Sequence, residues 1–288
     1  MKTTKILYNE NKIWSETTRD ASYSHQQGEF SIRMVFHGWE EYTIGKKKIN
    51  LYPGNFLVIN HDTVYHRKIY SDFPANTFAV AFAAKFLADF HRVHLATEAF
   101  LLDDPFNEQG GALPSFLETI YTLRGDMMFN TQHLVGHFQG LVTDELLIDC
   151  YLYHCLLLFY RVYNRDILAK IQKLENLKRE TRIEIFKRVT MAKDYMQSNF
   201  NRLLTIDEIS RHACLSPTHF YRTFKQIHHY SPHRYLVDVR LDNARHYLRK
   251  TEYCLSEIVT LVGFENTSSF IRLFRSRFGQ TPGDFRLN

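Results

Sequence analysis

Apolar and polar positions alternate with a period of two over much of the first hundred residues, which is the pattern of β-strands. Residues 29–38 show it best, because Phe30, Ile32 and Met34 alternate with more polar neighbours. We expect a half-buried strand there. Shorter runs at 42–44, 49–51, 56–60, 64–70 and 76–82 are separated by turn residues such as Pro53-Gly54-Asn55. Several short strands at this spacing predict a sandwich or a small barrel.

From about residue 113 the apolar positions recur with the period of helices. We expect short helices over 113–124 and 132–141, and a longer helix over 144–163 with Thr143 as its N-cap. The long helix is apolar almost all round, so it must be buried on more than one side. Packing against the barrel is one explanation for an apolar surface on all sides of this helix. A subunit interface is the other, and it predicts a homodimer. The polar segment 164–180 is predicted to be a linker, helical in part.

The C-terminal third contains an internal repeat. Glu208-Ile209 recurs as Glu257-Ile258, and Phe220-x-Arg222-x-Phe224 recurs as Phe270-x-Arg272-x-Phe274. Each copy predicts a helix, a tight turn and a second helix. A Ser-Pro or Thr-Pro pair follows each copy and predicts a further helix start, because proline suits the first helical position. The expected N-caps within the copies are Thr205, Ser216, Ser256 and Asn266.

The second helix of each copy has an apolar face of phenylalanines and an outward stripe of hydroxyl and basic side chains. Such a stripe suits the major groove of DNA, where arginine contacts guanine, hydroxyls contact either edge and basic groups neutralise phosphates. A single helix of this kind is more typical of a solvated surface, but two copies favour DNA binding. The candidate DNA-contacting residues are Ser216, Thr218, Tyr221, Arg222, Lys225, Thr267, Ser268, Arg272 and Arg275.

Charge is distributed unevenly along the chain. Residues 181–288 hold 17 Lys and Arg against 10 Asp and Glu, a net +7, whereas the other 180 residues hold 19 against 21, a net −2. The basic C-terminal third indicates a polyanionic partner, and an ordinary solvated basic surface is the alternative.

The C-terminal segment, about 183–286, resembles the AraC/XylS transcriptional regulators. The resemblance rests on Ile258-x-x-x-x-Gly263-Phe264, the spaced phenylalanines that follow, and Gly279-x-Thr281-Pro282-x-x-Phe285-Arg286. It implies two helix-turn-helix units joined by a long helix over 232–250, with recognition helices over 217–227 and 267–278. It also implies double-stranded DNA as a partner, with RNA polymerase as a further one. When this sequence is matched to the family position by position, the resemblance implies that six residues contact bases: Thr218, Tyr221, Arg222, Thr267, Ser268 and Arg272.

Two positions depart from this family pattern. Cys214 stands where the family usually has the turn glycine, which the second copy keeps as Gly263, and His229 stands where the second copy has Gly279. A non-glycine residue in a left-handed conformation costs about 1–2 kcal/mol. We therefore expect the first unit to dock less regularly than the second.

The N-terminal region resembles the cupin-like sensor barrel of many such regulators, through the residues from Tyr42 to His66. Cupin enzymes hold a metal with a His-x-His pair, and none occurs near Glu40 and Glu41, so no metal or other cofactor is expected. A polar lining in an aromatic barrel predicts a pocket for a small-molecule effector. The candidate ligand-binding residues are Arg33, His37, Tyr65 and His66.

Composition points to a cytoplasmic protein with no membrane partner. The four cysteines show neither metal-ligand spacing nor a disulfide framework, and the first fifteen residues lack the apolar core of a signal peptide. The most apolar stretch, 146–160, is interrupted by Asp149 and His154 and falls short of the roughly 20 residues that cross a bilayer.

These patterns together predict an α+β multidomain chain. We expect a cupin-like sensor barrel over 1–112, a helical dimerisation segment over 113–163, a linker over 164–180 and an AraC-type DNA-binding domain over 181–288. The predicted function is a sequence-specific transcription regulator that responds to a ligand through the barrel. One alternative is a regulator that is constitutive or controlled by a protein partner, with a structural barrel. The other is a cupin-type enzyme that binds DNA.

Overall fold

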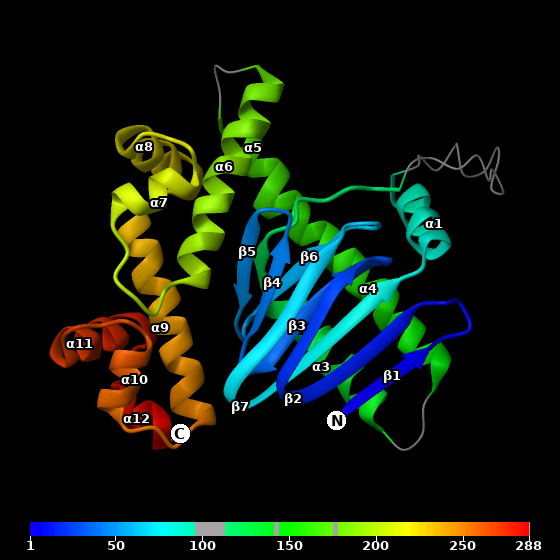
Figure 1. Cartoon of the computed structure of the whole chain (residues 1–288), viewed down its shortest axis with the longest axis horizontal. Helices are drawn as coiled ribbons and strands as arrows, with labels where there is room; N and C mark the ends of the chain where they lie inside the picture. Colours follow the sequence, from blue (N-terminus) through cyan, green and yellow to red (C-terminus); the bar gives the residue numbers. More distant parts are fainter. Residues whose placement is uncertain (96–112, 141–143, 175–177, 288) are drawn as a thin grey trace. The chain divides into compact units, whose positions relative to one another are not determined.

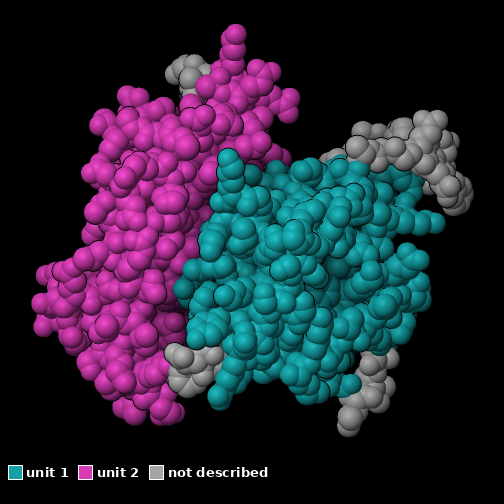
Figure 2. All heavy atoms as spheres, viewed as in Figure 1, with its two compact units in different colours: residues 1–164 teal, residues 165–288 magenta. Residues whose placement is uncertain are grey.

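The computed structural model describes residues 1–95, 113–140, 144–174 and 178–287. They divide into two compact units, Met1–Asn164 and Arg165–Asn288, which we call the barrel unit and the helical unit (Figure 2). Each is described by itself. Of the predicted linker, residues 175–177 lie outside the described part, and the rest begins with a π-helical turn at Asn164–Leu168 and the short helix α5, Ala169–Gln172.

The described strands of the barrel unit form one eight-stranded antiparallel sheet that curls into a nearly closed barrel (Figure 1). The main path runs β1-β2-β7-β3-β6-β8, and β4 pairs with β5 and β7. The expected runs 64–70 and 76–82 are one long strand, β7. The strand bounds are β1 Lys2–Ile6, β2 Lys12–Gln26, β3 Phe30–His37, β4 Glu40–Ile44, β5 Lys47–Leu51, β6 Asn55–Ile59, β7 Tyr65–Phe82 and β8 Ile120–Thr122.

Strand β3 lies where the alternation predicts it, but it is buried on both faces and not on one. Arg33 and Val35 face the barrel interior, where Val35 belongs to an apolar cluster that includes Tyr42 and Tyr65. On the other face, Phe30 packs 5.7 Å from the ring of Phe159 on a helix. The outer face of β3 is buried because helices pack against the sheet. The alternation of residues along one strand cannot reveal such a neighbour.

The described helices of the barrel unit are α1 (Ala84–Leu95), α3 (Gly125–Gln139) and α4 (Glu145–Tyr163). Helix α1 was not predicted. The helix predicted over 113–124 is wrong, because residues 120–122 form β8 and pair with β6. The predicted helix over 132–141 begins seven residues earlier, at Gly125, and its expected end, Leu141, lies outside the described residues.

Helix α4 crosses one face of the sheet (Figure 1). The expected cap, Thr143, lies outside the described residues, and the carboxylate of Asp144 accepts from the Leu147 amide at 3.1 Å. By length and mean hydropathy, the helical run Glu145–Gln172 is long and apolar enough to cross a membrane. Its fully buried Leu152, Leu156 and Phe159 are core residues of the barrel unit, so we interpret α4 as a core helix.

The helical unit contains the duplicated helix pairs that the repeat predicts, α7–α8 and α10–α11. Figure 1 shows the two pairs at opposite ends of the long helix α9, whose bounds agree with the predicted 232–250. The described helices are α6 Arg179–Ser198, α7 Ile206–His212, α8 Pro217–His228, α9 Pro232–Lys250, α10 Leu255–Leu261, α11 Thr267–Phe278 and α12 Pro282–Leu287.

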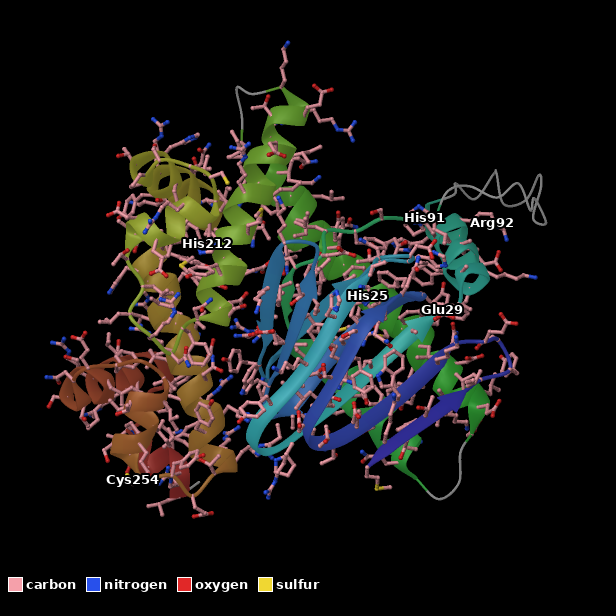
Figure 3. All side chains as sticks on the ribbon, viewed as in Figure 1. His25, Glu29, His91, Arg92, His212 and Cys254 are labelled. Carbon is pink, nitrogen blue, oxygen red and sulfur yellow. The ribbon has the colours of Figure 1, made fainter. Side chains whose placement is uncertain are left out.

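The helix caps follow the sequence with one exception. The side chains of Thr205, Ser216 and Asn266 accept from backbone amides three residues on, as expected. The prediction that Ser256 caps α10 is wrong, because the cap is Cys254, which is labelled in Figure 3. The Cys254 amide donates to the Glu257 carboxylate at 2.6 Å. This arrangement is a capping box, in which the side chain three residues after the cap accepts from the backbone amide of the cap residue.

Four turn positions of the two repeats have left-handed backbone. Cys214 (φ 50°) and His229 (φ 64°) occupy the positions that Gly263 (φ 80°) and Gly279 (φ 77°) occupy in the second copy. The left-handed backbone that the family pattern implies is thus present at both non-glycine positions, Cys214 and His229. Both copies therefore keep the same turn, and the first copy keeps it with side chains that disfavour it.

Candidate DNA interface and barrel cavity

Buried phenylalanines fix the orientation of the two predicted recognition helices. Phe220 and Phe224 of α8 have no exposed area, and neither have Phe270 and Phe274 of α11. The spacing of four residues places each pair on one side of its helix. The opposite side of each helix must therefore face outward.

All nine predicted DNA-contacting residues lie on these outward sides and are exposed. They are Ser216, Thr218, Tyr221, Arg222, Lys225, Thr267, Ser268, Arg272 and Arg275. Ser216 also caps α8, and its hydroxyl oxygen accepts from the His219 amide at 3.3 Å. Three of the nine, Ser268, Arg272 and Arg275, also line a shallow, open depression on α11. The other residues that line it are Ile271, Ser276, Gly279 and Thr281.

The basic side chains on these two faces have no acidic partner among the described residues. Neither Arg222 nor Lys225 on α8, nor Arg272 or Arg275 on α11, forms an ion pair there. Arg277, on the inner side of α11, behaves differently because it pairs with two aspartates of α9. The outward cations are thus available to an external polyanion.

Helix α9 is tied to its neighbours by arginine contacts. Arg277 of α11 bonds Asp242 at 2.9 Å and also pairs with Asp238, both on α9. Arg240 of α9 donates to the carbonyl oxygens of Phe200 and Arg202, each at 2.8 Å. These bonds fix α11 and the turn after α6 on the long helix.

The last residue of α8, His228, has a strongly lowered pKa. Burial, together with the nearby charges of Lys170, Lys193, His229 and Lys173, lowers the pKa of His228 to about 2. The His228 ring is therefore neutral at physiological pH. It packs against the ring of Phe224 at 4.4 Å.

The barrel unit has a small cavity lined by residues of β1, β2, β3, β6 and β7, with a volume of about 180 Å³. Of the four predicted ligand-binding residues, Arg33 and Tyr65 line it together, and an Arg33 guanidinium nitrogen donates to the Tyr65 hydroxyl. His37 and His66 are not among its lining residues. His66 follows Tyr65 on the opposite face of β7, where its ring lies 4.6 Å from that of His25.

A buried charge network adjoins this cavity, and the sequence analysis missed it. Arg67 bonds Glu16 at 2.6 Å, Glu40 at 2.5 Å and the Thr77 hydroxyl at 3.0 Å. Tyr23 donates to Glu16 at 2.6 Å. Burial raises the pKa of Glu16, but the hydrogen bonds from Tyr23 and Arg67 outweigh it and hold that pKa below its usual value.

The signal for this network lies in β2, where Trp14 and Glu16 share one face. The surrounding stretch is rich in Ser, Thr and charged residues, so its pattern does not indicate a strand. Among the described residues, no group of three or more His, Cys, Asp or Glu is placed to hold a metal. His91 lies on α1 and not on a barrel strand (Figure 3).

Comparison with known proteins bears on the helical unit. Residues 209–288 match the family model described as a helix-turn-helix domain. The bifunctional transcriptional activator/DNA repair enzyme AdaA of Bacillus subtilis is 36% identical over 98 residues, which are 34% of this chain and 46% of AdaA. The regulator GbdR of Pseudomonas aeruginosa is 26% identical over 198 residues, 68% of this chain and 47% of GbdR. The matches thus span about half the length of these relatives.

A solved structure of an AraC-type regulator from Chromobacterium violaceum is 29% identical, with a TM-score of 0.34. The alignment covers 35% of this chain and 89% of that one. The matched residues 209–288 contain both recognition helices, the long helix between them and the exposed basic stripes. The helical unit of this chain therefore carries a helix-turn-helix domain.

Proposed function

We propose that the chain is a sequence-specific transcription regulator, in which the helical unit binds double-stranded DNA and the barrel unit binds a small-molecule effector. It acts by binding and not by catalysis, in the cytoplasm, and RNA polymerase is its partner at the promoter. The observation that carries the proposal is the pair of exposed helices whose arginines and lysine lack acidic partners. Two such helices at the ends of α9 suit two major-groove segments.

Each outward residue has a role in this proposal. Arg222 and Arg272, near the middle of their helices, are the base readers, because a guanidinium can contact guanine O6 and N7 together. Thr218, Tyr221, Thr267 and Ser268 contact base edges at the helix starts. Lys225 and Arg275 lie one turn later and neutralise phosphates.

Salt dependence of DNA binding by the full chain tests the proposal. Each phosphate contact lowers the slope of log K against log salt by about 0.9. We expect a steep loss of affinity with salt. When Arg222, Lys225, Arg272 and Arg275 are all replaced by Gln, the slope should become shallower by about 2 units, because Lys225 and Arg275 are the proposed phosphate contacts. Gln replacement of the exposed Lys46 and Lys48 in the barrel unit is the matched control and should leave the slope unchanged. Salt-insensitive binding, or a slope that the fourfold variant keeps, contradicts the proposal.

A further inference from the structure

The cavity in the barrel unit is rich in basic side chains. Lys2, Lys12, Arg33 and Arg67 all line it, whereas Glu29 is the one acidic residue in its described lining. Apolar walls come from Trp14, Ile59 and Ala81 among others. Glu29, labelled in Figure 3, belongs to the connection between β2 and β3, and residues 27–29 of this connection line the cavity.

Most of these cations are neutralised within the barrel. Two carboxylates, Glu16 and Glu40, surround Arg67, and Lys12 bonds Glu29 at 2.6 Å. Lys2 lies 4.9 Å from the ring of Tyr23, whose hydroxyl bonds Glu16. Four cations thus stand against three carboxylates, and one positive charge is left over.

Neither Lys2 nor Arg33 forms an ion pair among the described residues, but Lys2 is exposed to solvent, so the buried unpaired charge lies at Arg33. Its side chain is only 5% exposed, and no carboxylate among the described residues lies within ion-pair distance of it. Its hydrogen-bond partners are two neutral hydroxyls, Ser31 at 3.3 Å and Tyr65. A buried guanidinium without a counterion is costly, so such groups are normally paired.

Aromatic rings hold this guanidinium in place without neutralising it. Its central carbon lies 4.6 Å from the ring centre of Tyr65, 5.0 Å from that of Trp14 and 5.7 Å from that of Tyr42. Cation–π contacts and the Tyr65 hydroxyl fix its position in advance. The site is therefore a preformed fork of N–H donors that faces a cavity and lacks an anion.

We propose that the effector is a small organic monocarboxylate, whose carboxylate pairs with Arg33 and whose apolar part lies against Trp14 and Ile59. This inference rests on the proposed function, in which the barrel unit binds an effector. A guanidinium fork matches a carboxylate by two parallel hydrogen bonds. One unpaired positive charge selects a single negative charge. The volume of about 180 Å³ is below the roughly 300–1,000 Å³ typical of drug-sized ligands, which selects a small molecule.

Tryptophan fluorescence of the full chain tests this proposal directly. The chain has two tryptophans, Trp14 in the cavity wall and Trp39, which stacks on Tyr52. In a Trp39→Phe background, emission reports on Trp14 alone. The probes are acetate, butyrate and benzoate, each paired with its neutral amide. We expect a saturable change in Trp14 emission with at least one carboxylate, and its neutral amide should bind at least tenfold more weakly. The Arg33→Met variant should bind that carboxylate at least tenfold more weakly than the chain with Arg33.

Control variants make the result specific. Arg33→Lys keeps the charge without the fork and should retain part of the affinity, which also serves if Arg33→Met fails to fold. Lys48→Met removes an exposed cation on β5, away from the cavity lining, and should change nothing. Equal affinity for carboxylate and amide overturns the proposal. So does affinity unchanged in both Arg33 variants, or no saturable response to any carboxylate.

Salt-dependent DNA binding, measured on the same proteins, distinguishes failure of the proposed carboxylate site from failure of the proposed function. Intact DNA binding with no preference for carboxylates refutes the effector class alone. Loss of DNA binding in the unsubstituted chain refutes the proposed function, whatever the cavity binds.

Discussion

Arginine side chains of the helical unit fall into two groups, according to whether an acidic or carbonyl oxygen lies within reach. Arg277 and Arg240 bond to protein oxygens and hold helices together. Arg222 and Arg272 are exposed and have no such bond among the described residues. The sequence predicts a role for Arg222 and Arg272 but for neither Arg277 nor Arg240, and only the structure separates the cations that bond within the protein from those that are available.

Replacement of Arg272 should affect base preference, because its proposed contact is to a base. Arg272→Ala is expected to cost about 1–3 kcal/mol on the preferred site and to relax preference at one position. Lys225→Ala should weaken all sequences about equally and make the salt slope shallower by about one unit. Selection of binding sites from a random DNA pool measures both. An unchanged site preference in Arg272→Ala would show that it does not read a base.

The left-handed turns allow a matched pair of stability tests. A Cβ on Gly263 would lie 2.8 Å from the Phe200 carbonyl oxygen, whereas a Cβ on Gly279 would meet nothing within 4 Å. Gly279→Ala should therefore cost only the backbone strain, about 1–2 kcal/mol. Gly263→Ala should cost clearly more, because the backbone around Phe200 must also shift. Urea unfolding of the full chain compares them, and equal costs would contradict the steric argument.

At the scale of elements, the sequence predicted the helical unit better than the barrel unit. Helices α8, α9 and α11 agree within a residue with the bounds that the family resemblance implies, and their starts were also predicted by caps in the local sequence. Strand β2 and helix α1 were missed. The polar stretch that forms β2 becomes a strand by pairing with β7, between Lys12↔Ala81 and Gln26↔Tyr65, and no local pattern records such a distant partner.

The same distinction applies to the candidate sites. The outward stripes of α8 and α11 follow from helix geometry alone, so all nine of their predicted residues lie together on exposed faces. The cavity is made by distant strands, and alternation along one strand showed only that Arg33 and Tyr65 could face inward. It could not show that Trp14, Lys12 and Arg67 would join them.

Helix α8 should lose stability in mild acid because of His228. The pKa of this histidine is about 2 in the folded chain and about 6.5 when unfolded, so below pH 6.5 the unfolded state binds the extra proton. Its contribution to stability is fully present above pH 6.5 and decreases as the pH falls, by up to about 1.4 kcal/mol per pH unit.

Denaturant unfolding between pH 7 and pH 5 measures this effect. His228→Gln should flatten the dependence, whereas His233→Gln, at an exposed position on α9, should leave it as it is. If the two variants and the unsubstituted chain lose stability in parallel, His228 is not the group responsible.

For the whole molecule, the two recognition helices predict the shape of the DNA site. Helix α9 has 19 residues and spans about 28 Å at 1.5 Å per residue. With the half-widths of the packed units, the recognition helices lie roughly 34 Å apart, near one turn of B-DNA. One chain should protect two major-groove segments about 10 bp apart on one face of the duplex. Hydroxyl-radical footprinting that shows one segment per chain would mean that a single unit docks, and the strained first unit is then the one expected to be free.

Assembly is predicted from α4. Leu157 and Leu158 remain partly exposed, and Leu146 is 70% exposed, although the opposite side of the helix is buried. We propose that two chains pair through this side around a two-fold axis. Replacement of Leu157 and Leu158 by Glu should give monomers in sedimentation at micromolar concentration. A chain that sediments as a monomer before any substitution, with and without DNA, contradicts a dimer.

The long strand β7 has a consequence for how the barrel unit opens. It pairs with β2 along most of its length, with β3 at one end and with β4 at the other. Among the described strands, the hairpins β1–β2 and β4–β5 are each joined to β7 by a ladder, and neither can separate without breaking that ladder. The strands joined to β7 should therefore exchange their amide hydrogens as one cooperative set. Because β2, β3 and β7 also wall the cavity, a ligand bound there would slow exchange across the whole set and not only beside itself.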